Sequence, residues 1–442
     1  MFRRILIANR GEVVSRIIRT CNRMGIETVV VTSSADRDLA YLSEATEVAE
    51  IGGVRSYLDM DAIIEAAKRT RCAAIHPGWG FLSENPIFAA RCEAVGITFI
   101  GPSPGAMRQM ADKSTARETM TKLGLFPIPG WSDKILSLEN AITAAEQIGY
   151  PLLLKAVSGG GGRGMRQVHD SAQLESAFQS ASAEAQSAFG DPALYAERLI
   201  TGGRHIEFQV LSDGLNAVVV GARECSMQRR HQKLLEETPS VAVTEEQYKQ
   251  LSKQIEQVCV ALNYRGAGTV EMLRDQDGEI WFMEMNTRLQ VEHTITEELT
   301  GIDLVEQQLR IAANQPLKLS VESTGHSIQC RINAEDVSLN FRPSPGQITQ
   351  LKWATGDGIR IDSHLCEGDK ISPHYDSMVA KVIVHGQTRL EAIERMKYVL
   401  RETKIEGVPT TIPLHLKLLE HPQFQTGNYD TKFVERHLED LI

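Results

Sequence analysis

Short strands and helices alternate through the first hundred residues, and this alternation restricts the fold of the chain more than any other feature. Strands rich in apolar residues are predicted at residues 5–8, 28–32, 72–75 and 98–100. Helices are predicted from about residue 12 to 25, from 59 to 70, and after Pro86. Because strands of this kind need helical crossovers, the alternation predicts a parallel sheet with helices on both faces.

The third of these strands is directly followed by a loop, residues 76–85, that reads HPGWGFLSEN. Open α/β sheets bind ligands at the carboxyl ends of their strands, which is where this loop lies. The segment is therefore either a ligand-binding loop or a simple turn between a strand and a helix.

A chain of 442 residues is too long for one simple core, so about two to four domains are expected. We expect an N-terminal α/β domain at residues 1–111, a central region at 112–316 and a strand-rich domain at 317–442. A subdomain at about 129–201 belongs to the central region. Further helices are predicted at 137–148, 244–262, 303–313 and, as the last of the chain, 389–403. The fold class is thus a multidomain combination of α/β and α+β units.

Composition excludes several classes of protein. The net charge of −10 argues against general nucleic-acid binding. The apolar runs are too short for a membrane span, and the N-terminal run is too short for a signal peptide. The seven cysteines contain no Cys-x-x-Cys pair, which argues against a disulfide framework or a zinc site. We therefore expect a soluble cytoplasmic protein that binds neither nucleic acid nor membranes.

Two strands at 268–273 and 279–283, joined by a turn at 275–278, form a predicted hairpin. If Arg274 pairs with Glu279, one face of the hairpin carries Glu271, Phe282, Glu284, Asn286 and Arg288. The other face, which reads as core, then carries Val270, Met272, Trp281, Met283 and Met285. Two carboxylates and an amide oxygen suit Mg²⁺ or Mn²⁺, although a solvated face with ordinary charges is the alternative. A register shift of one residue would separate Glu271 from the other ligands.

The glycine-rich run 159–164 lies between two predicted strands, 152–158 and 165–168. Its glycines fit a dinucleotide-binding fingerprint, but a strand rather than a helix follows them, which argues against that fold. A glycine-rich hairpin is typical of a flexible flap whose amides wrap phosphate, with Lys155 supplying charge just before it. The alternative is a structural hairpin without a ligand.

Three further positions suit a nucleotide. Residues 197–200 end a strand whose hydrogen-bonding edge, framed by apolar side chains, fits a purine ring. The segment 225–233 concentrates hydrogen-bond donors, so it is either a solvated basic turn or an anion-binding element. Lys113 lies in the first turn of a helix, where a cation opposes the helix dipole, so it either points to solvent or has an anionic partner.

The order of these pieces resembles the ATP-grasp superfamily and, more narrowly, the biotin carboxylase family. The resemblance spans essentially the whole chain. It is carried by residues 7–12 (IANRGE), 76–85, 226–233, 284–293, 330–336 and 375–378 (YDSM). It implies that the central region is an ATP-grasp unit with the glycine-rich run as a mobile lid. It also implies that residues 317–442 form the C-terminal biotin carboxylase domain.

The resemblance implies an ATP site with a metal centre. By this resemblance ATP is bound by Lys113, Lys155, Gly161, Gly162, Glu197, Arg198, Leu199, Ile200, His205, Gln228 and His231, together with Glu271 and Glu284. Glu271, Glu284 and Asn286 are implied to hold Mg²⁺ or Mn²⁺. The metal ions and lysines then neutralise charge on the transferring phosphoryl group.

The same resemblance implies the second substrate and the reaction. Bicarbonate is implied to bind among Lys233, Arg288, Gln290 and Val291. Glu292 is implied to deprotonate it for attack on ATP, which gives carboxyphosphate. The CO₂ released from carboxyphosphate carboxylates biotin, with Arg331 stabilising the enolate oxygen and Trp79 contacting the ring. The catalytic set is thus expected to be Lys233, Arg288, Glu292 and Arg331.

Three residues depart from the usual pattern of the family. Trp79 stands where tyrosine is usual, Arg198 replaces a common lysine, and Thr294 replaces a proline. None of these changes removes a catalytic group. They indicate a divergent member, which serves either acetyl-CoA carboxylase or a related acyl-CoA or 2-oxoacid carboxylase.

A biotin carrier segment is not recognised, because Met396-Lys397 lies within a predicted amphipathic helix. We expect a separate biotin carboxyl carrier protein, separate carboxyltransferase subunits and a homodimer. One rival hypothesis is an ATP-grasp ligase that forms amides or acts in purine synthesis, which has no need of Arg331. Another is an assembly subunit that binds a nucleotide but has lost catalytic activity. Such a subunit would not need the complete set of Lys233, Glu271, Glu284, Asn286, Arg288, Glu292 and Arg331.

Overall fold

The computed structural model describes residues 1–157 and 164–441, and it describes only the backbone of Lys113, Ser114 and Ser132. The predicted lid residues Gly161 and Gly162 therefore lie outside the described residues. Within the described part of the chain, no helix combines the length and the apolar character needed to cross a bilayer.

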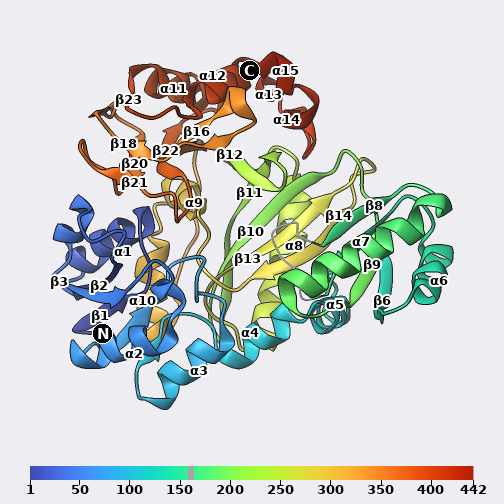
Figure 1. The fold of residues 1–442 in the computed structure, drawn as a ribbon, viewed down its shortest axis with the longest axis horizontal. Coiled ribbons are helices and arrows are strands. Elements are labelled where there is room, and N and C mark those ends of the chain that lie inside the picture. Colours follow the sequence, from blue (N-terminus) through green and yellow to red (C-terminus); the bar gives the residue numbers. More distant parts are fainter. Residues whose placement is uncertain (158–163, 442) are drawn as a thin grey trace.

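The N-terminal unit contains a parallel sheet, as predicted, and the sheet has five strands rather than the four expected (Figure 1). Its strands are β1 (Arg4–Ile7), β2 (Glu27–Ser33), β3 (Glu47–Gly52), β4 (Ala74–His76) and β5 (Thr98–Phe99), in the order β3-β2-β1-β4-β5. The helices are α1 (Glu12–Arg23), α2 (Met60–Arg69), α3 (Pro86–Ala94) and α4 (Pro104–Ala111). Sequence analysis missed β3, because this edge strand buries only Ala49 and has no apolar run. The loop 76–85 leaves the carboxyl end of β4, as expected.

The second sheet has eight antiparallel strands and joins the central region to the C-terminal region. Its order is β14-β13-β10-β11-β12-β15-β22-β20. The strands are β10 (Arg204–Asp213), β11 (Ala217–Arg229), β12 (Gln232–Thr238), β13 (Arg265–Arg274), β14 (Ile280–Asn286), β15 (His326–Asn333), β20 (Ile359–Ser363) and β22 (Met378–Gly386). Because β12 pairs with β15, the hydrogen-bonded sheet is continuous across residue 316.

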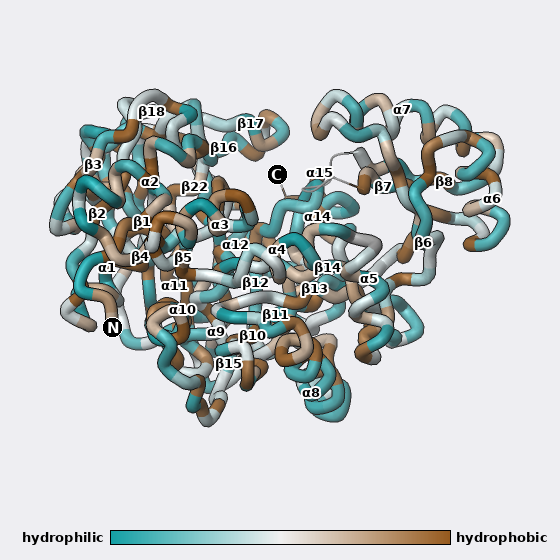
Figure 2. Tube along the Cα trace, turned by 90° about the horizontal axis from the view of Figure 1, so that it is seen from below, coloured by the Kyte–Doolittle hydropathy of each residue, from teal (hydrophilic) through white to brown (hydrophobic). Residues whose placement is uncertain are grey.

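A third sheet of four strands forms a lobe apart from the rest of the molecule (Figure 2). It contains β6 (Gly130–Ile135), β7 (Leu152–Ala156), β8 (Met165–Val168) and β9 (Leu194–Arg198), in the order β6-β9-β7-β8. The helices α6 (Leu138–Ile148) and α7 (Ser171–Phe189) complete its own apolar core. β7 and β8 are paired antiparallel on either side of residues 158–163.

Polar caps fix where most of the predicted helices begin. The side chains of Asp112, Ser137, Asp170, Thr244, Asp303 and Thr388 each accept a hydrogen bond from a backbone N–H in the first turn. The capped helices are α5 (Lys113–Lys122), α6, α7, α8 (Glu245–Ala261), α10 (Leu304–Ala312) and α11 (Arg389–Glu402). These caps satisfy amides that have no partner within the helix.

The helix predictions were incomplete, and one expectation was wrong. The short α9 (His293–Thr300) was not predicted, because its polar sequence has no clear amphipathic pattern. The helix α11 is not the last of the chain, since α12 (Ile412–Glu420), α13 (Pro422–Gln425), α14 (Phe433–Arg436) and α15 (Leu438–Leu441) follow it. These segments bury Leu414, Leu418, Phe424 and Phe433 in the main core, which explains why they fold against it.

Next to its turn, the β13–β14 hairpin differs in register from the prediction by one residue, because Arg274 pairs with Ile280 rather than with Glu279. A bulge at Met283 adds a second shift of one residue in the same direction, so that Glu271 lies directly opposite Glu284. A total shift of two residues leaves both side chains on the predicted face. The two carboxylates therefore share a face after all.

The same bulge corrects three side-chain assignments in the hairpin. Phe282 pairs with Met272 and packs in the core, although it was expected beside Glu271. Met283 lines the cleft described below, and Trp281 lies opposite Leu273 on the same face, although both were expected in the core. The physical reason is that the extra residue of a bulge reverses the alternation of side chains on its own strand.

The buried His415 on α12 provides a test of how the C-terminal helices pack. Its Nε2 donates a hydrogen bond of 2.8 Å to the carbonyl of Arg331, and burial lowers the pKa of this imidazole to about 4.

Between pH 6.5 and 4 the unfolded chain therefore binds a proton at His415 that the folded chain does not. The free energy of unfolding should fall as pH falls through this range, by about 2 kcal/mol at pH 5 from this residue. Urea titrations at pH 7 and pH 5 should show a smaller fall for His415→Gln than for the wild type. Equal falls in the two proteins would contradict the assignment.

Candidate active site

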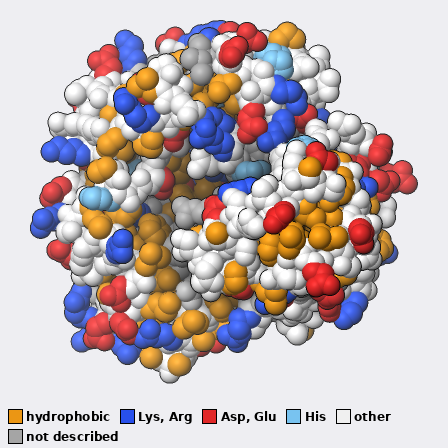
Figure 3. All heavy atoms as spheres, turned by 45° about the vertical axis from the view of Figure 1, so that its right-hand side comes forward, with side chains coloured by type: hydrophobic (Ala, Val, Ile, Leu, Met, Phe, Trp, Pro, Cys, Tyr) orange, Lys and Arg blue, Asp and Glu red, His pale blue; other side chains and the backbone are white. Residues whose placement is uncertain are grey.

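A cleft of about 1080 Å³ lies between the lobe of β6–β9 and the two larger sheets. Figure 3 shows the molecule hollowed between its lobes, with Lys and Arg side chains along part of the rim. The predicted site residues that line this cleft are Trp79, Lys155, Glu197, Arg198, Leu199, Ile200, His205, Gln228, His231, Lys233, Glu271, Glu284, Asn286, Arg288, Gln290, Val291 and Arg331. The structure thus brings together residues that are more than 250 positions apart in the chain.

For three predicted ATP-site residues the structure does not describe the position relative to the cleft. Lys113 begins α5, but its side chain lies outside the described part of the chain. Gly161 and Gly162 lie outside the described residues altogether. Their roles remain predictions.

Charged residues face one another across strands in a row that runs from the buried part of the sheet to the cleft, which only Glu271 and Glu284 of the row line. Arg223 on β11, Glu207 on β10, Glu271 on β13 and Glu284 on β14 are directly opposed in neighbouring strands. Like charges in opposed positions destabilise a sheet. The adjacent carboxylates Glu207 and Glu271 therefore need cations beside them.

Lys233 on β12 supplies the central cation. Its ammonium group lies 2.7 Å from a carboxylate oxygen of Glu292 and 3.2 Å from one of Glu271, and it also pairs with Glu207. Arg223 lies 3.1 Å from Glu207 on the other side. All of these side chains are buried or nearly so. One lysine thus holds three buried carboxylates in contact.

The cations keep these acids ionised. Burial disfavours the charged form of each carboxyl, but Lys233 outweighs it and lowers the pKa of Glu207 to about 2. In the same way, burial is outweighed by Lys233 and His205 at Glu271, whose pKa is lowered. At Glu292 burial is outweighed by Lys233 and Arg331, so its pKa is below its usual range.

Glu292 lies directly beneath the cleft between two cations. Its carboxylate is fully buried and accepts hydrogen bonds from Lys233 at 2.7 Å and from Arg331 at 2.9 Å. Arg331 also donates to Glu236 at 2.6 Å, which fixes the plane of its guanidinium group. The predicted base is therefore held on both sides by predicted catalytic residues.

Arg288 is held by a residue of the N-terminal loop. Its Nε donates to Glu84 at 2.9 Å, and the other oxygen of Glu84 accepts from the backbone N–H of Thr287 at 2.9 Å. Arg288 also donates to Gln290 at 3.0 Å and to Asn286 at 3.1 Å. The loop 76–85 is thus in contact with the predicted bicarbonate segment, and its Trp79 lines the cleft, which favours a ligand-binding loop over a simple turn.

The far wall of the cleft, in the lobe of β6–β9, carries a further buried ion pair. Lys155 on β7 pairs with Glu197 on β9, and Arg117 lies 3.5 Å from Glu197. Burial disfavours the charged Lys155, but Glu197 outweighs it and raises the pKa of this ammonium group. The last two residues of β9 and the two residues after the strand, 197–200 in all, also line the cleft on this side.

The residues Glu271, Glu284 and Asn286 fit a hard divalent cation. They lie on one face of the hairpin, and the amide nitrogen of Asn286 donates to Glu271 at 2.7 Å. Glu284 is exposed to the cleft, whereas Glu271 is buried beside His205 and Lys233. Carboxylate and amide oxygens at an open cleft suit Mg²⁺ that also binds phosphate and water.

The segment 225–233 is a hairpin rather than a loop. β11 continues to Arg229 and β12 begins at Gln232, with Arg230 and His231 at the tip in the left-handed region. Gln228 and Lys233 are paired across the two strands and both line the cleft. The structure therefore favours an anion-facing element over a solvated turn.

Sequence reasoning missed several partners of the site. These are Glu207, Arg223, Glu236, Glu84, Glu12 and Lys381. One signal for Glu207 was present, since residues 205–211 read HIEFQVL and alternate polar with apolar side chains. The others contact the site only through pairings between strands or units that are distant in sequence, which no local pattern reveals.

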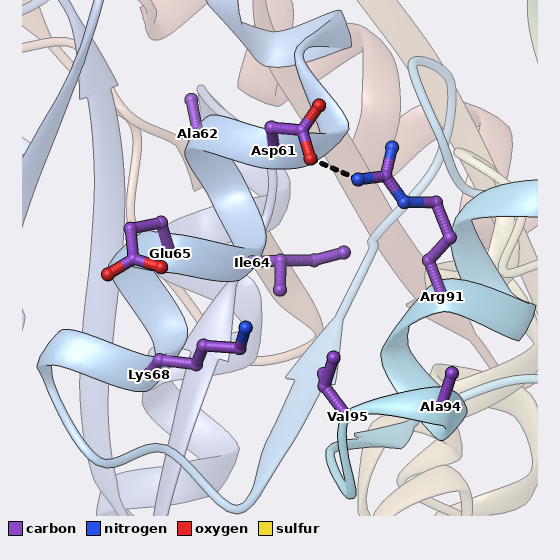
Figure 4. A pocket seen from close by; sticks show the side chains of 8 residues that line it. All are labelled: Asp61, Ala62, Ile64, Glu65, Lys68, Arg91, Ala94 and Val95. Atoms are coloured by element: carbon purple, nitrogen blue, oxygen red, sulfur yellow. Dashed lines mark hydrogen bonds and ion pairs between the residues drawn. The ribbon is translucent and has the colours of Figure 1, made fainter.

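A second, smaller hollow lies away from the residues that line the large cleft. It has a volume of about 520 Å³ and lies between α2 and α3 (Figure 4). Its lining residues are Asp61, Ala62, Ile64, Glu65, Lys68, Arg91, Ala94 and Val95, with an ion pair between Asp61 and Arg91. None of the predicted site residues that the structure describes lines it, so the larger cleft is the candidate site.

Three family models match successive parts of the chain. Residues 1–107 match the biotin carboxylase N-terminal domain, residues 112–320 the ATP-binding domain of the carbamoyl-phosphate synthase L chain, and residues 329–436 the biotin carboxylase C-terminal domain. The chain is also 48% identical to biotin carboxylase 1 of Bacillus subtilis over 445 residues, which cover 99% of both proteins. The chain belongs to the biotin carboxylase family.

Solved structures of this family share the whole fold. A biotin carboxylase from Campylobacter jejuni, in a β-γ-ATP complex, has a TM-score of 0.97 at 45% identity and 99% coverage of both chains. The biotin carboxylase domain dimer of 2-oxoglutarate carboxylase from Hydrogenobacter thermophilus has a TM-score of 0.97 at 41% identity. That structure contains MgADP, ADP and bicarbonate, and the match covers 100% of this chain and 99% of that one.

All three of these departures from the family pattern make contacts in the structure. The indole N–H of Trp79 donates to Glu12 at 3.2 Å, so this ring is oriented by a buried carboxylate. Arg198 lies 3.3 Å from Asp275 and stacks over Trp281, with 5.3 Å from its Cζ to the ring centroid. Thr294 donates its hydroxyl to Gln329.

Removing the central cation tests the electrostatic structure of this biotin carboxylase site. In Lys233→Met the carboxylates of Glu207, Glu271 and Glu292 lose their common partner. Loss of a buried ion-pair partner lowers the free energy of unfolding by about 3–5 kcal/mol. Thermal unfolding without nucleotide should show a clearly lower midpoint for this variant.

The matched control is Lys249→Met, which removes a lysine whose only described acid partner is the exposed Glu245. Its unfolding midpoint should stay at the wild-type value, because exposed ion pairs contribute little. Equal midpoints for the two lysine variants would contradict the account of the cluster.

Proposed function

We propose that this protein uses ATP to carboxylate biotin with bicarbonate, as the biotin carboxylase component of a biotin-dependent carboxylase. The observation that carries the proposal is the position of Glu292. Its carboxyl group is fully buried and held between Lys233 and Arg331, two cations that lower its pKa and so favour the ionised form. A base enclosed by cations in this way suits an anionic substrate whose proton must be removed.

ATP is proposed to bind between the lobe of β6–β9 and the large sheet. Lys155 supplies positive charge for its phosphates, His231 offers a hydrogen bond beside them, and the backbone from Glu197 to Ile200 borders the base. Gln228 and His205 complete the wall near the phosphates. Arg198, Leu199, Lys113 and the glycines Gly161 and Gly162 are assigned to this site by the family pattern. Closure of the glycine-rich lid would then keep water from the reaction.

Magnesium or manganese is proposed to bind at Glu271, Glu284 and Asn286. Their oxygen donors face the same cleft as Lys155 and Lys233. When bound, such an ion neutralises charge on the phosphates of ATP during phosphoryl transfer.

Bicarbonate is proposed to bind against Lys233, Arg288, Gln290 and Val291. Its negative charge competes with Glu292 for Lys233, so the pKa of Glu292 rises as the substrate binds. Glu292 then accepts the bicarbonate proton, and the freed oxygen attacks the γ-phosphorus of ATP. The bond from that phosphorus to ADP breaks, which leaves carboxyphosphate and ADP.

Carboxyphosphate then breaks down to CO₂ and phosphate beside biotin. The phosphate removes the N1 proton of the biotin ureido ring, and N1 forms a bond to CO₂. Arg331 stabilises the negative charge that develops on the ureido oxygen, and Trp79 contacts the ring. Glu236 supports this role, because it holds the Arg331 guanidinium group in one orientation.

The partners of the protein follow from this reaction. We propose that biotin arrives on a separate carboxyl carrier protein and leaves for carboxyltransferase subunits. The final acceptor is then the acyl group of acetyl-CoA or of a related acyl-CoA, or a 2-oxoacid. A homodimer is part of the proposal, since the 2-oxoglutarate carboxylase domain crystallised as a dimer. A cytoplasmic location is also part of the proposal.

The proposal predicts how Glu292→Gln behaves. The amide keeps the size of the side chain but cannot accept the proton. The rate of bicarbonate-dependent ATP cleavage should fall roughly 100- to 10,000-fold, with ATP affinity nearly unchanged. Steady-state assays of ADP release and nucleotide-binding titrations measure the two effects separately.

In the wild type, ATP cleavage should require bicarbonate and should be accelerated by free biotin. Cleavage that requires an amine or a carboxylic acid instead would favour an amide-forming ATP-grasp ligase. Loss of ATP binding in Glu292→Gln, comparable with its loss of turnover, would contradict the role of Glu292.

A further inference from the structure

Lys381 is a fully buried lysine next to the catalytic arginine. It lies on β22, directly opposite Arg331 on β15 and Asp362 on β20. Its side chain therefore occupies the same face of the large sheet as Arg331. Burying a lysine is costly unless strong partners surround it, so its contacts identify what it holds in place.

The ammonium group of Lys381 has two close partners from other units. It lies 2.9 Å from a carboxylate oxygen of Glu12 on α1, and it donates a hydrogen bond of 3.1 Å to the backbone carbonyl of Val291. Asp362 faces it at 4.0 Å, but that carboxylate is already paired with Arg360 at 2.8 Å. Glu12 is therefore the main counterion of Lys381.

The carbonyl of Val291 belongs to the peptide that leads into Glu292. Because the peptide unit is planar, holding this carbonyl also fixes the direction of the Glu292 N–H and the start of α9. Val291 lines the cleft, and the Glu292 side chain projects from the next residue. A small shift of this peptide would move the base relative to bicarbonate.

Glu12 connects the same lysine to the loop at the other side of the cleft. Its second oxygen accepts the indole N–H of Trp79 at 3.2 Å. Asn9 adds to this connection, since its amide donates to the carbonyls of Pro77 and Trp79 at 2.7 Å each. Asn9, just before α1, and Glu12, the first residue of α1, thus hold the loop 76–85 at Trp79 (the Trp79 loop). Lys381 connects Glu12 to the backbone of Val291.

We propose that the buried Glu12–Lys381 pair is a positioning element that fixes the Val291 carbonyl, and with it the bicarbonate site, relative to the Trp79 loop. This inference rests on the proposed function, because it assigns bicarbonate to residue 291 and biotin to Trp79. Lys381 itself does not touch either substrate. It acts through the backbone of the segment that does.

The test compares two double variants, because removing Lys381 alone would leave the buried Glu12 unpaired. Glu12→Gln with Lys381→Met removes both charges and the donor to the Val291 carbonyl. Glu12→Gln with Lys381→Gln also removes both charges but keeps an N–H donor at position 381. The matched control is Arg389→Met with Glu237→Gln, which removes a part-buried ion pair of 2.6 Å whose described contacts lie outside residues 286–292.

For each protein, the rate of ATP cleavage is measured while the concentration of bicarbonate or of ATP is varied. The midpoint of thermal unfolding is measured as well. Misplacement of a reacting group by about 1 Å costs up to roughly 100-fold. We therefore expect the methionine variant to raise the KM for bicarbonate roughly 10- to 100-fold while the KM for ATP changes less than about twofold. The glutamine variant should recover part of this loss, and the control pair should retain the wild-type KM for bicarbonate.

Two results would overturn the inference while leaving the proposed function in place. One is an unchanged KM for bicarbonate in the methionine variant. The other is an equal rise of both KM values that the control pair reproduces, since this indicates only lost stability. Absence of bicarbonate-dependent ATP cleavage in the wild-type protein would overturn the proposed function, and this inference with it.

Discussion

The contact of Lys233 with Glu207, Glu271 and Glu292 is the interaction on which the rest of the site depends. Three buried carboxylates at such short range repel one another, and the ammonium group between them, supported by Arg223, His205 and Arg331, favours the ionised form of all three. One of these acids is assigned to the metal and another to proton removal. When an anionic substrate binds to Lys233 and draws it away from Glu292, the pKa of Glu292 rises. The base therefore becomes stronger when its own substrate is bound.

Both larger sheets contribute to this arrangement. The antiparallel sheet carries the charged row from Arg223 to Glu284 and continues through β15 and β22 to Arg331 and Lys381. The parallel sheet contributes its β4 loop, whose Glu84 holds Arg288. The lobe of β6–β9 faces them with Lys155 and Glu197. Phosphoryl transfer and biotin binding are therefore proposed to occur between units, and the N-terminal unit is joined to the large sheet by the Arg288–Glu84 pair and by the buried Glu12–Lys381 pair.

Much of the fold and of the candidate site was predictable from the sequence, because strand alternation and polar caps are local properties. The ligand face of the β13–β14 hairpin was predicted correctly for Glu271 and Glu284, but through a register that the structure corrects. The bulge at Met283 has no local signal, and its shift adds to the one at Arg274, so that the two together return Glu284 to the face of Glu271. The partners Glu84, Glu236 and Lys381 were not predictable, since each reaches the site from another strand or unit.

The central claim is that an oxygen of bicarbonate, deprotonated by Glu292, attacks the γ-phosphate of ATP. The most direct measurement uses bicarbonate labelled with ¹⁸O, with ATP and free biotin, and mass spectrometry of the phosphate released. The account predicts that the phosphate carries an oxygen from bicarbonate, because that oxygen bridges carbon and phosphorus in carboxyphosphate. Phosphate labelled only from water would contradict it, since water rather than bicarbonate would then have attacked ATP.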